Sequence, residues 1–312
     1  MGTYTYPAPP AKVSGGDTLE IHHMLKTPAL IGRRVRTLLE NRFIADALLT
    51  GRFQAVGGAI LYETGESIFG DEDPESIAPG GAYPLTEQVM GELAAARVDK
   101  WGRDTPVTDE AINRLGINPV DRALTKLVNT TVRFVDSAAL GVIASKITAT
   151  YDTTTGTNAP GAWTTGKGIV GGVLASIAKV EALDEGFSPD TIVLKDAQWA
   201  TAMTALIDAG MLPREGANPL VTGQWPETLG LRWLKSNHTP TTDPMLFDTT
   251  QLGGMADEKQ NAPGYASAAG IGVETKSIRD DEHDRYKLRA RRVTVPVVLE
   301  PSAGLRVVNA GL

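Results

Sequence analysis

Apolar residues recur at helical spacing in the middle of the chain, over residues 108–149. Asn118 and Pro119 are typical of a helix N-cap and of the first helical position. After them, apolar positions return at steps of three or four residues in two neighbouring rows. The rows are Val120, Leu124, Leu127, Thr131, Val135, Ala138 and Val142, and beside them Val128, Val132, Ala139, Ile143 and Ile147.

Two adjacent rows predict one long helix with a broad buried face, ending near Ile147. Its length would be about 43 Å at 1.5 Å per residue. A short helical segment from Thr108 is expected to precede it. Leu124, Leu127 and Val135 are predicted to lie in the core that this spine helix forms.

Upstream of this helix the pattern changes twice. Residues 1–26 are polar and proline-rich without periodicity, which predicts a mobile arm. Residues 27–51 carry an apolar stripe that predicts a helix, and Arg33, Arg34 and Arg36 lie on its other face. Two interpretations of these arginines stay open: a solvated face, or a contact with nucleic acid or with a neighbouring acidic surface.

Residues 53–62 and 94–105 are predicted strands, and the first is interrupted by Gly57 and Gly58. The stretch between them is rich in Gly, Pro, Ser, Asp and Glu and is too long for an ordinary hairpin turn. Such a loop is either functional or disordered. With its two strands it could project on the order of 50 Å and would need a partner to hold it.

The second half of the chain alternates helices and strands. After a Thr/Gly/Asn-rich linker, residues 167–185 predict a helix that stops at Gly186, and residues 190–195 predict a buried strand. Asp196 is the expected cap of the next helix, and short strands follow at 229–235 and 245–247. Residues 273–300 predict a long hairpin, and residues 305–308 predict a last strand beside that hairpin.

Composition and net charge exclude several kinds of site and of binding partner. Of 312 residues, 42% are hydrophobic and 21% charged, which is an ordinary globular balance. The absence of cysteine excludes disulfides, thiolate metal sites and cysteine nucleophiles. A net charge of -7 argues against tight wrapping of nucleic acid, because lysine and arginine supply phosphate affinity. No run of eighteen apolar residues and no targeting signal is present, so a soluble protein is expected.

Local motifs do not assemble into a catalytic site. The stretch from Gly161 to Lys167 fits G-x-x-x-x-G-K, but Gly168 stands where a phosphate-binding loop needs Ser or Thr, so a linker and helix start are favoured. Residues 280–284 could bind a metal, but a hairpin turn is the favoured interpretation. The acidic residues 70–75 lack calcium-loop spacing, and His22-His23 has no third ligand nearby. We therefore expect no enzyme activity, no metal and no cofactor.

The order of elements resembles the major capsid protein of tailed bacteriophages with the HK97-type fold. The strongest match is residues 100–136, where a strand reading KWG, a helix start reading TDEA and a helix reading LTKLVNTTVRFVD occur together. The resemblance implies an α+β, HK97-like capsid fold with an N-terminal arm, an extended two-stranded loop, a long spine helix, a peripheral lobe and an α/β axial lobe. The implied parts are an arm and basic helix (1–51), an extended loop (52–104), the spine helix of the peripheral domain (105–150), an axial domain (151–265) and peripheral-domain strands (266–312).

The resemblance also implies a function: a structural protein that self-assembles into pentamers and hexamers and forms an icosahedral shell around double-stranded phage DNA. The implied location is the virion capsid, with assembly in the host cytoplasm. Implied partners are other copies, a portal, and a separate scaffolding protein or protease, while a decoration protein stays open. The enclosed double-stranded DNA is expected to make only weak, non-specific contacts. No membrane is expected. The implied assembly contacts are Arg33, Arg34, Arg36, Phe53, Tyr62, Phe69 and Trp101.

Two alternatives remain: an encapsulin-like protein nanocompartment, and, less favoured, a nucleotide-binding enzyme. Some members of the family cross-link an extended-loop lysine to a neighbour's asparagine. Here no lysine lies between Lys26 and Lys100, so that chemistry is not expected. The short arm indicates that scaffolding comes from a separate protein or that the chain is a processed form.

Overall fold

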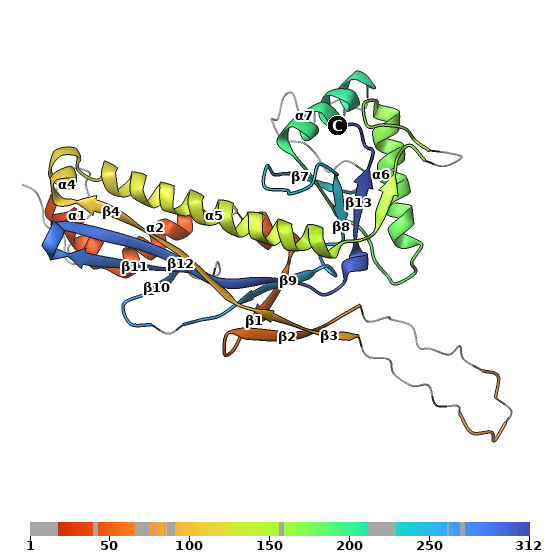
Figure 1. Ribbon diagram of the computed structural model, residues 1–312, viewed down its shortest axis with the longest axis horizontal. Coiled ribbons are helices and arrows are strands. Elements are labelled where there is room, and N and C mark those ends of the chain that lie inside the picture. The colour runs from red at the N-terminus through yellow and green to blue at the C-terminus, as the bar shows by residue number, and fades with distance from the viewer. Residues whose placement is uncertain are drawn as a thin grey trace, which may run out of the picture. The chain divides into compact units, whose positions relative to one another are not determined.

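The structure is a computed structural model, shown in Figure 1. It describes residues 18–39, 43–65, 75–77, 79–83, 85, 91–155, 159–210, 229–260, 262–268 and 272–312. The chain forms two compact units. Unit 1 takes in the described parts of Met1–Arg42, Asp99–Phe134 and Lys259–Thr294, and unit 2 takes in those of Phe43–Val98, Val135–Glu258 and Val295–Leu312.

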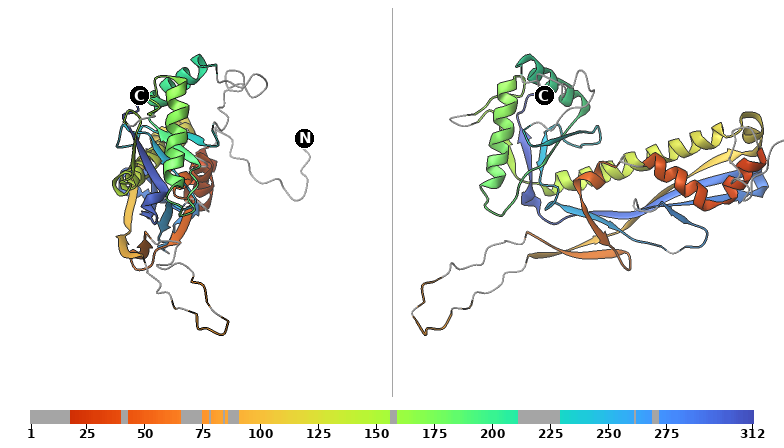
Figure 2. Two further views of the ribbon diagram at one scale, coloured as in Figure 1. Left: turned by 90° about the vertical axis from the view of Figure 1, so that its right-hand side faces the viewer. Right: turned by 180° about the vertical axis from the view of Figure 1, so that it is seen from behind.

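Unit 1 is built on an antiparallel sheet with the strand order β10-β11-β12-β4. Its strands and helices, some of which are also visible from behind in Figure 2, are as follows: α1 (Thr18–Lys26), α2 (Pro28–Leu39), β4 (Asp99–Thr108), α4 (Asp109–Leu115), β10 (Ala266–Ala268), β11 (Val273–Asp280), the 3₁₀ turn η1 (Asp281–His283) and most of β12 (Arg285–Val298).

Strand alternation gives this sheet one apolar face. Tyr286, Leu288 and Ala290 of β12 are buried on the same side as Thr275 of β11. Helix α2 packs against β10 and β11 there. The helix lies close to β10 at Gly32, where a Cβ would be in ordinary van der Waals contact, 3.4 Å from the Ala266 Cβ.

The long helix α5 spans Asn118–Lys146, as the apolar rows predict, and it contributes residues to both units. Leu124, Leu127 and Val135 are at most 2% exposed, and most of the other predicted positions are buried; Val132, Ala138 and Val142 are partly exposed. By length and composition alone α5 could cross a membrane. Its buried apolar rows fit the core helix of a globular unit equally well.

Unit 2 contains a mixed sheet with the strand order β5-β13-β8-β6-β7. Helices α6 and α7 pack against each other, and their apolar residues share one core with the sheet. Trp163, Ile192, Leu246 and Leu305 are at most 1% exposed in that core. The elements are β5 (Thr150–Asp152), α6 (Gly166–Glu181), β6 (Thr191–Leu194), α7 (Asp196–Asp208), β7 (Arg232–Lys235), β8 (Met245–Phe247), η2 (Pro301–Ala303) and β13 (Gly304–Val308).

The rest of unit 2 comprises two strand pairings and a short helix. Strand β1 pairs in parallel with β9, which lies next to β12. Strands β2 and β3 form a separate antiparallel pair. The bounds are α3 (Ala45–Leu48), β1 (Gly51–Gln54), β2 (Ala59–Thr64), β3 (Glu92–Arg97) and β9 (Gly253–Asp257).

The N-terminal predictions need correction. Residues 18–26 are the helix α1, because Ile21 and Leu25, one turn apart, are both fully buried. Two buried positions beside two polar histidines gave too weak a pattern to be read as periodic. The helix predicted over residues 27–51 is also wrong in extent: it is divided into α2 and α3, and strand β1 already begins at Gly51.

The strand predictions need three corrections. The residues predicted as one strand over 94–105 form β3 and β4, which belong to different sheets. Strand β13 does not lie beside the β11–β12 hairpin, because the turn η2 redirects the chain and Leu305 and Val307 enter the core of the five-stranded sheet. Strands β5, β9 and β10 were not predicted. Two predicted helix ends also differ from the structure. Asp196 was predicted as the cap of α7 but is its first residue, and its side chain accepts a hydrogen bond from Asn237. Helix α6 was predicted to run to Gly186 but ends at Glu181.

Candidate functional site

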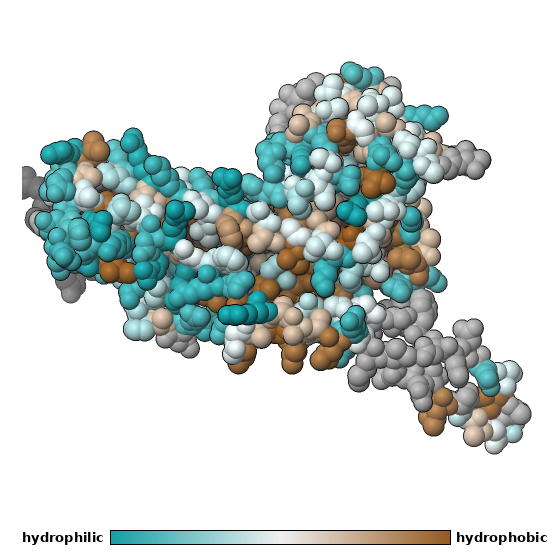
Figure 3. Space-filling model, viewed as in Figure 1, coloured by the Kyte–Doolittle hydropathy of each residue, from teal (hydrophilic) through white to brown (hydrophobic). Residues whose placement is uncertain are grey.

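The β2–β3 hairpin exposes large apolar side chains. Leu61 is 70% exposed and Leu93 68% exposed, and Val56, in the turn before β2, is 78% exposed. Leu61 pairs with Ala95 and Glu63 with Leu93, so the two leucines are diagonal neighbours on one face of the pair. In Figure 3 hydrophobic side chains gather along this region.

This face has no cover within the described part of the chain. Residues 59, 61 and 63 and their partners 97, 95 and 93 are all exposed, whereas Ile60, Tyr62 and Ala94 on the other face are partly buried. No third described strand pairs with β2 or β3. A two-stranded pair is marginally stable in water by itself, and contiguous exposed apolar groups mark an interaction surface. The hairpin is therefore the best candidate for contact with another molecule.

The exposed apolar character continues beyond the hairpin. Tyr83 is 85% exposed and Leu85 96% exposed, and both lie in the segment that joins the two strands. Phe69, predicted as a contact, lies outside the described residues.

The predicted arginines lie together on α2. Arg33, Arg34 and Arg36 are all exposed. Arg34 Nη2 lies 3.2 Å from Asp121 Oδ1 on α5, and Arg33 and Arg34 line a shallow groove with Leu30. An exposed ion pair of this kind contributes little to stability, so the two interpretations of these arginines remain open.

The predicted aromatic contacts are less exposed than the hairpin leucines. Phe53 in β1 and Tyr62 in β2 are partly buried. The Trp101 ring of β4 packs on Phe134 of α5, with ring centroids 4.5 Å apart, and Phe134 is 46% exposed. Trp101 thus joins strand and helix within unit 1. Its proposed assembly role stays a prediction.

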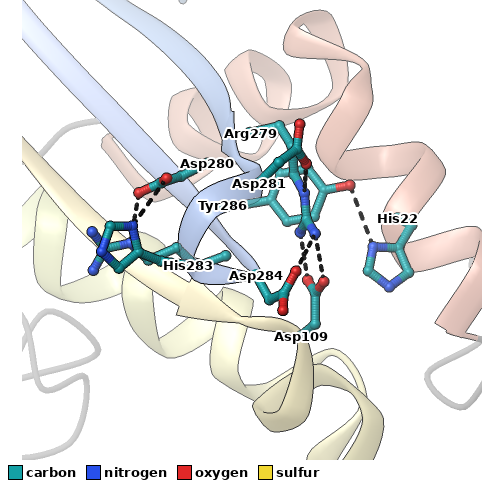
Figure 4. Close-up of polar contacts among 9 residues, drawn as sticks. His22, Asp109, Arg279, Asp280, Asp281, His283, Asp284 and Tyr286 are labelled. Atoms are coloured by element: carbon teal, nitrogen blue, oxygen red, sulfur yellow. Dashed lines mark hydrogen bonds and ion pairs between the residues drawn. The ribbon is translucent and has the colours of Figure 1, made fainter.

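A polar cluster holds the end of the β11–β12 hairpin in unit 1 (Figure 4). The Arg279 guanidinium donates two hydrogen bonds of 2.7 Å to Asp109, at the start of α4, and its Nε donates to Asp281 at 2.7 Å. It also lies 4.8 Å from the centre of the Tyr286 ring. The bonds from Arg279 lower the pKa of Asp109, and burial raises the pKa of Tyr286. The sequence predicted the turn over residues 280–284 and the helix start at Asp109, but not the contact between Arg279 and Asp109.

The turn interpretation of residues 280–284 is confirmed, since η1 joins β11 to β12. Asp280, Glu282 and His283 lie close enough to share an ion. However, Asp280 Oδ2 already accepts from Arg285 Nε at 2.9 Å and from Lys287 Nζ at 2.8 Å, and these bonds lower its pKa. Two cations on one carboxylate oppose the approach of a third.

The glycine-rich stretch before α6 is a helix start. Thr165 is its N-cap, and its Oγ1 accepts a hydrogen bond of 3.2 Å from the Gly168 N–H. A Cβ at residue 168 would overlap the Ala162 carbonyl oxygen. The backbone N–H that a phosphate would need is thus bonded to the cap, in agreement with the favoured interpretation.

These features define the class of the protein. A long helix shared by two units, a mixed sheet covered by two helices and an uncovered hairpin are the parts of the HK97-type shell fold. The chain matches the capsid structure of cyanophage P-SCSP1u at 15% identity with a TM-score of 0.58, over 83% of this chain and 86% of that one. It matches a virus-like particle from Pyrococcus furiosus at 9% identity with a TM-score of 0.55, over 88% and 97%.

A third match is the SrpI encapsulin of Synechococcus elongatus PCC 7942, at 13% identity with a TM-score of 0.54, over 86% and 87% of the two chains. Residues 92–307 match the family model described as phage capsid protein, and the chain belongs to this family. It is a structural capsid protein that associates with its own copies. No curated protein matches the sequence.

Proposed function

We propose that copies of this chain form pentamers and hexamers that close into an icosahedral shell around double-stranded phage DNA. The β2–β3 hairpin supports this proposal, because its exposed leucines lie on a strand pair that has no cover within the described chain. Laid on a neighbouring copy, that face would become buried. Many such contacts, one or more per copy, would add up to a stable shell.

The remaining parts of the assembly are also proposals. The segments 1–51, 52–104, 105–150, 151–265 and 266–312 would act as arm, extended loop, spine, axial domain and peripheral strands. A portal and a separate scaffolding protein or protease would take part, and assembly would occur in the host cytoplasm. Contact with the enclosed DNA would be weak, since the chain carries a net charge of -7.

The test removes the two hairpin leucines. Burying side chains that are 70% and 68% exposed gains roughly 2 kcal/mol or more per copy, equivalent to about a thirtyfold change in the concentration needed for assembly. We expect Leu61→Ser with Leu93→Ser to abolish shells in electron micrographs at concentrations where the unchanged chain forms them. The matched control is Leu115→Ser with Leu174→Ser, because these leucines are 58% and 50% exposed outside the hairpin.

Circular dichroism of unassembled chains separates folding from assembly. The two double variants should melt at similar temperatures, slightly below that of the unchanged protein, because all four leucines are at least half exposed and lose only part of their burial. Equal shell formation by the two variants would contradict the role of the hairpin. An unchanged chain that stays monomeric under every assembly condition would contradict the shell itself.

An encapsulin-like shell is the second candidate, supported by the similarity in fold to the SrpI encapsulin. The family match favours the phage shell. Native particles distinguish the two, since nuclease-resistant double-stranded DNA is expected inside a phage shell and a cargo protein inside an encapsulin.

A further inference from the structure

The helices of unit 1 cover one face of its sheet. Helix α2 contacts β10 and β11 on the buried face. Phe134 of α5 packs on Trp101, whose partner across the strand pair, Arg292, is fully buried, so α5 covers the same face. Arg34 of α2 forms an ion pair with Asp121 of α5, and Figure 2 shows the two helices side by side from behind. The outer sides of α2 and α5 therefore form one surface.

This surface carries an excess of positive charge. Helix α2 and residues 118–134 of α5 contain one carboxylate, Asp121, in a chain whose net charge is -7. Six cations in the same segments are all exposed, and we call them the basic surface: Arg33, Arg34, Arg36, Arg122, Lys126 and Arg133. The last three are the α5 row. The basic surface thus has the charge opposite to that of the chain as a whole.

Most of these cations are not neutralised by the chain itself. Arg34 lies 3.2 Å from Asp121, and no carboxylate among the described residues pairs with the other five. The opposite face of the same sheet differs, because there Arg289 donates to both oxygens of Asp104, at 2.6 and 2.7 Å. Like charges four residues apart on a helix, as in the α5 row, destabilise it slightly. A cluster that lowers helix stability and has no partner in the chain indicates a ligand of opposite charge.

The α5 row is straight. Arg122, Lys126 and Arg133 recur at steps of four and seven residues, which puts them on one side of the helix along about 16 Å of its axis. Exposed Asn129 and Thr130 lie between them, and amide and hydroxyl groups also bond to phosphates. Duplex DNA presents one negative charge per about 1.7 Å of its axis, so a row of this length can meet several phosphates at once.

We propose that the basic surface binds the phosphate backbone of double-stranded DNA. The inference deepens the proposed function, on which it rests, because it names the residues through which the chain would touch the enclosed DNA. An acidic protein segment is the less favoured occupant. Protein interfaces are held by apolar and aromatic anchors at their centre, and the α5 row contains none. Contact through phosphates alone is independent of base sequence and weakens as the salt concentration rises.

The test neutralises the α5 row. Arg122→Gln with Lys126→Gln and Arg133→Gln should weaken binding of unassembled chains to a 20-base-pair duplex at least tenfold at about 0.05 M salt, measured by fluorescence anisotropy. The logarithm of the binding constant falls with the logarithm of the salt concentration, and each phosphate contact contributes about 0.9 to that slope. The variant should therefore reduce the slope by about 2.7. Two duplexes of unrelated sequence should bind with equal affinity.

The matched control removes the same charge elsewhere. Lys146→Gln with Lys167→Gln and Arg232→Gln changes three exposed cations of unit 2 that pair with no carboxylate among the described residues. It should change the affinity for DNA less than threefold. A second variant tests α2: Arg33→Gln with Arg36→Gln should reduce the slope by about 1.8, one contact for each arginine. All three variants should melt close to the unchanged protein, because the altered side chains are exposed.

Shell assembly distinguishes DNA from an acidic protein partner. The variant of the α5 row should form shells at the same concentration as the unchanged chain, since its hairpin is intact. Loss of shells with undiminished DNA binding would assign the basic surface to a protein and overturn the proposal. Equal DNA binding by this variant and the control would overturn it too, and so would a tenfold preference for one duplex sequence. Failure of the unchanged chain to form shells contradicts the proposed function instead, because DNA binding is measured on unassembled chains.

Discussion

Leu127→Ala tests whether α5 is the core of its unit. Leu127 is 2% exposed, and the substitution removes three carbon atoms from a closed environment. The lost transfer free energy is about 2.4 kcal/mol at roughly 0.8 kcal/mol per methylene. The cavity that remains raises the expected loss of unfolding free energy to about 3–4 kcal/mol.

Leu115→Ala is the matched control, because it is the same substitution in the same unit. Leu115 is 58% exposed, so the substitution loses roughly two-fifths of the transfer free energy of a buried leucine, about 1 kcal/mol. No closed cavity forms. Urea unfolding of unassembled chains, followed by circular dichroism, measures both differences. Equal midpoints for the two variants would refute the assignment of Leu127 to the core.

Two further predictions concern backbone packing and pH. Gly172→Ala should destabilise the protein by about 2 kcal/mol, because the added Cβ would overlap Trp163 Nε1. Gly141→Ala on α5 should stabilise it by about 0.5–1 kcal/mol, because no atom lies within 4 Å of the added Cβ and alanine favours a helix. Shifts of the same sign in thermal melts of the two variants would contradict this. Asp109→Asn should cost about 1 kcal/mol at pH 7. Since Arg279 lowers the folded-state pKa of Asp109 below 3.8, this difference should be full above pH 4 and shrink as the pH falls through the folded-state pKa. Urea unfolding from pH 7 to pH 3 measures the difference in unfolding free energy between Asp109→Asn and the unchanged chain, with the exposed Glu110→Gln as control. A difference that does not change with pH would rule the ion pair out.

The sequence predicted those elements whose pattern is long and local. The rows of α5 gave its bounds to within one residue, because 29 residues of helical spacing outweigh any single polar position. The β11–β12 hairpin was equally clear from its alternation. Helix α1 was missed because only Ile21 and Leu25 carry its pattern.

Short strands were missed for a different reason. Strands β5, β9 and β10 have three to five residues each, and they become strands through partners far away in sequence. Gly51 pairs with Gly254, for example, and Arg306 with Thr150. No local pattern encodes such pairings, since β-propensity depends on cross-strand neighbours. The same holds for Arg279 and Asp109, which lie 170 residues apart.

The role of the β2–β3 hairpin was hardest to predict because no described part of the chain covers its exposed face. A buried leucine in α5 has its neighbours in the same unit, so its spacing reveals its role. Leu61 and Leu93 alternate as in any strand, and only their exposure of about 70% in the folded chain distinguishes them from core residues. Candidate contact residues are therefore identified by the apolar side chains that the folded chain leaves exposed, a property that depends on the whole fold rather than on local sequence.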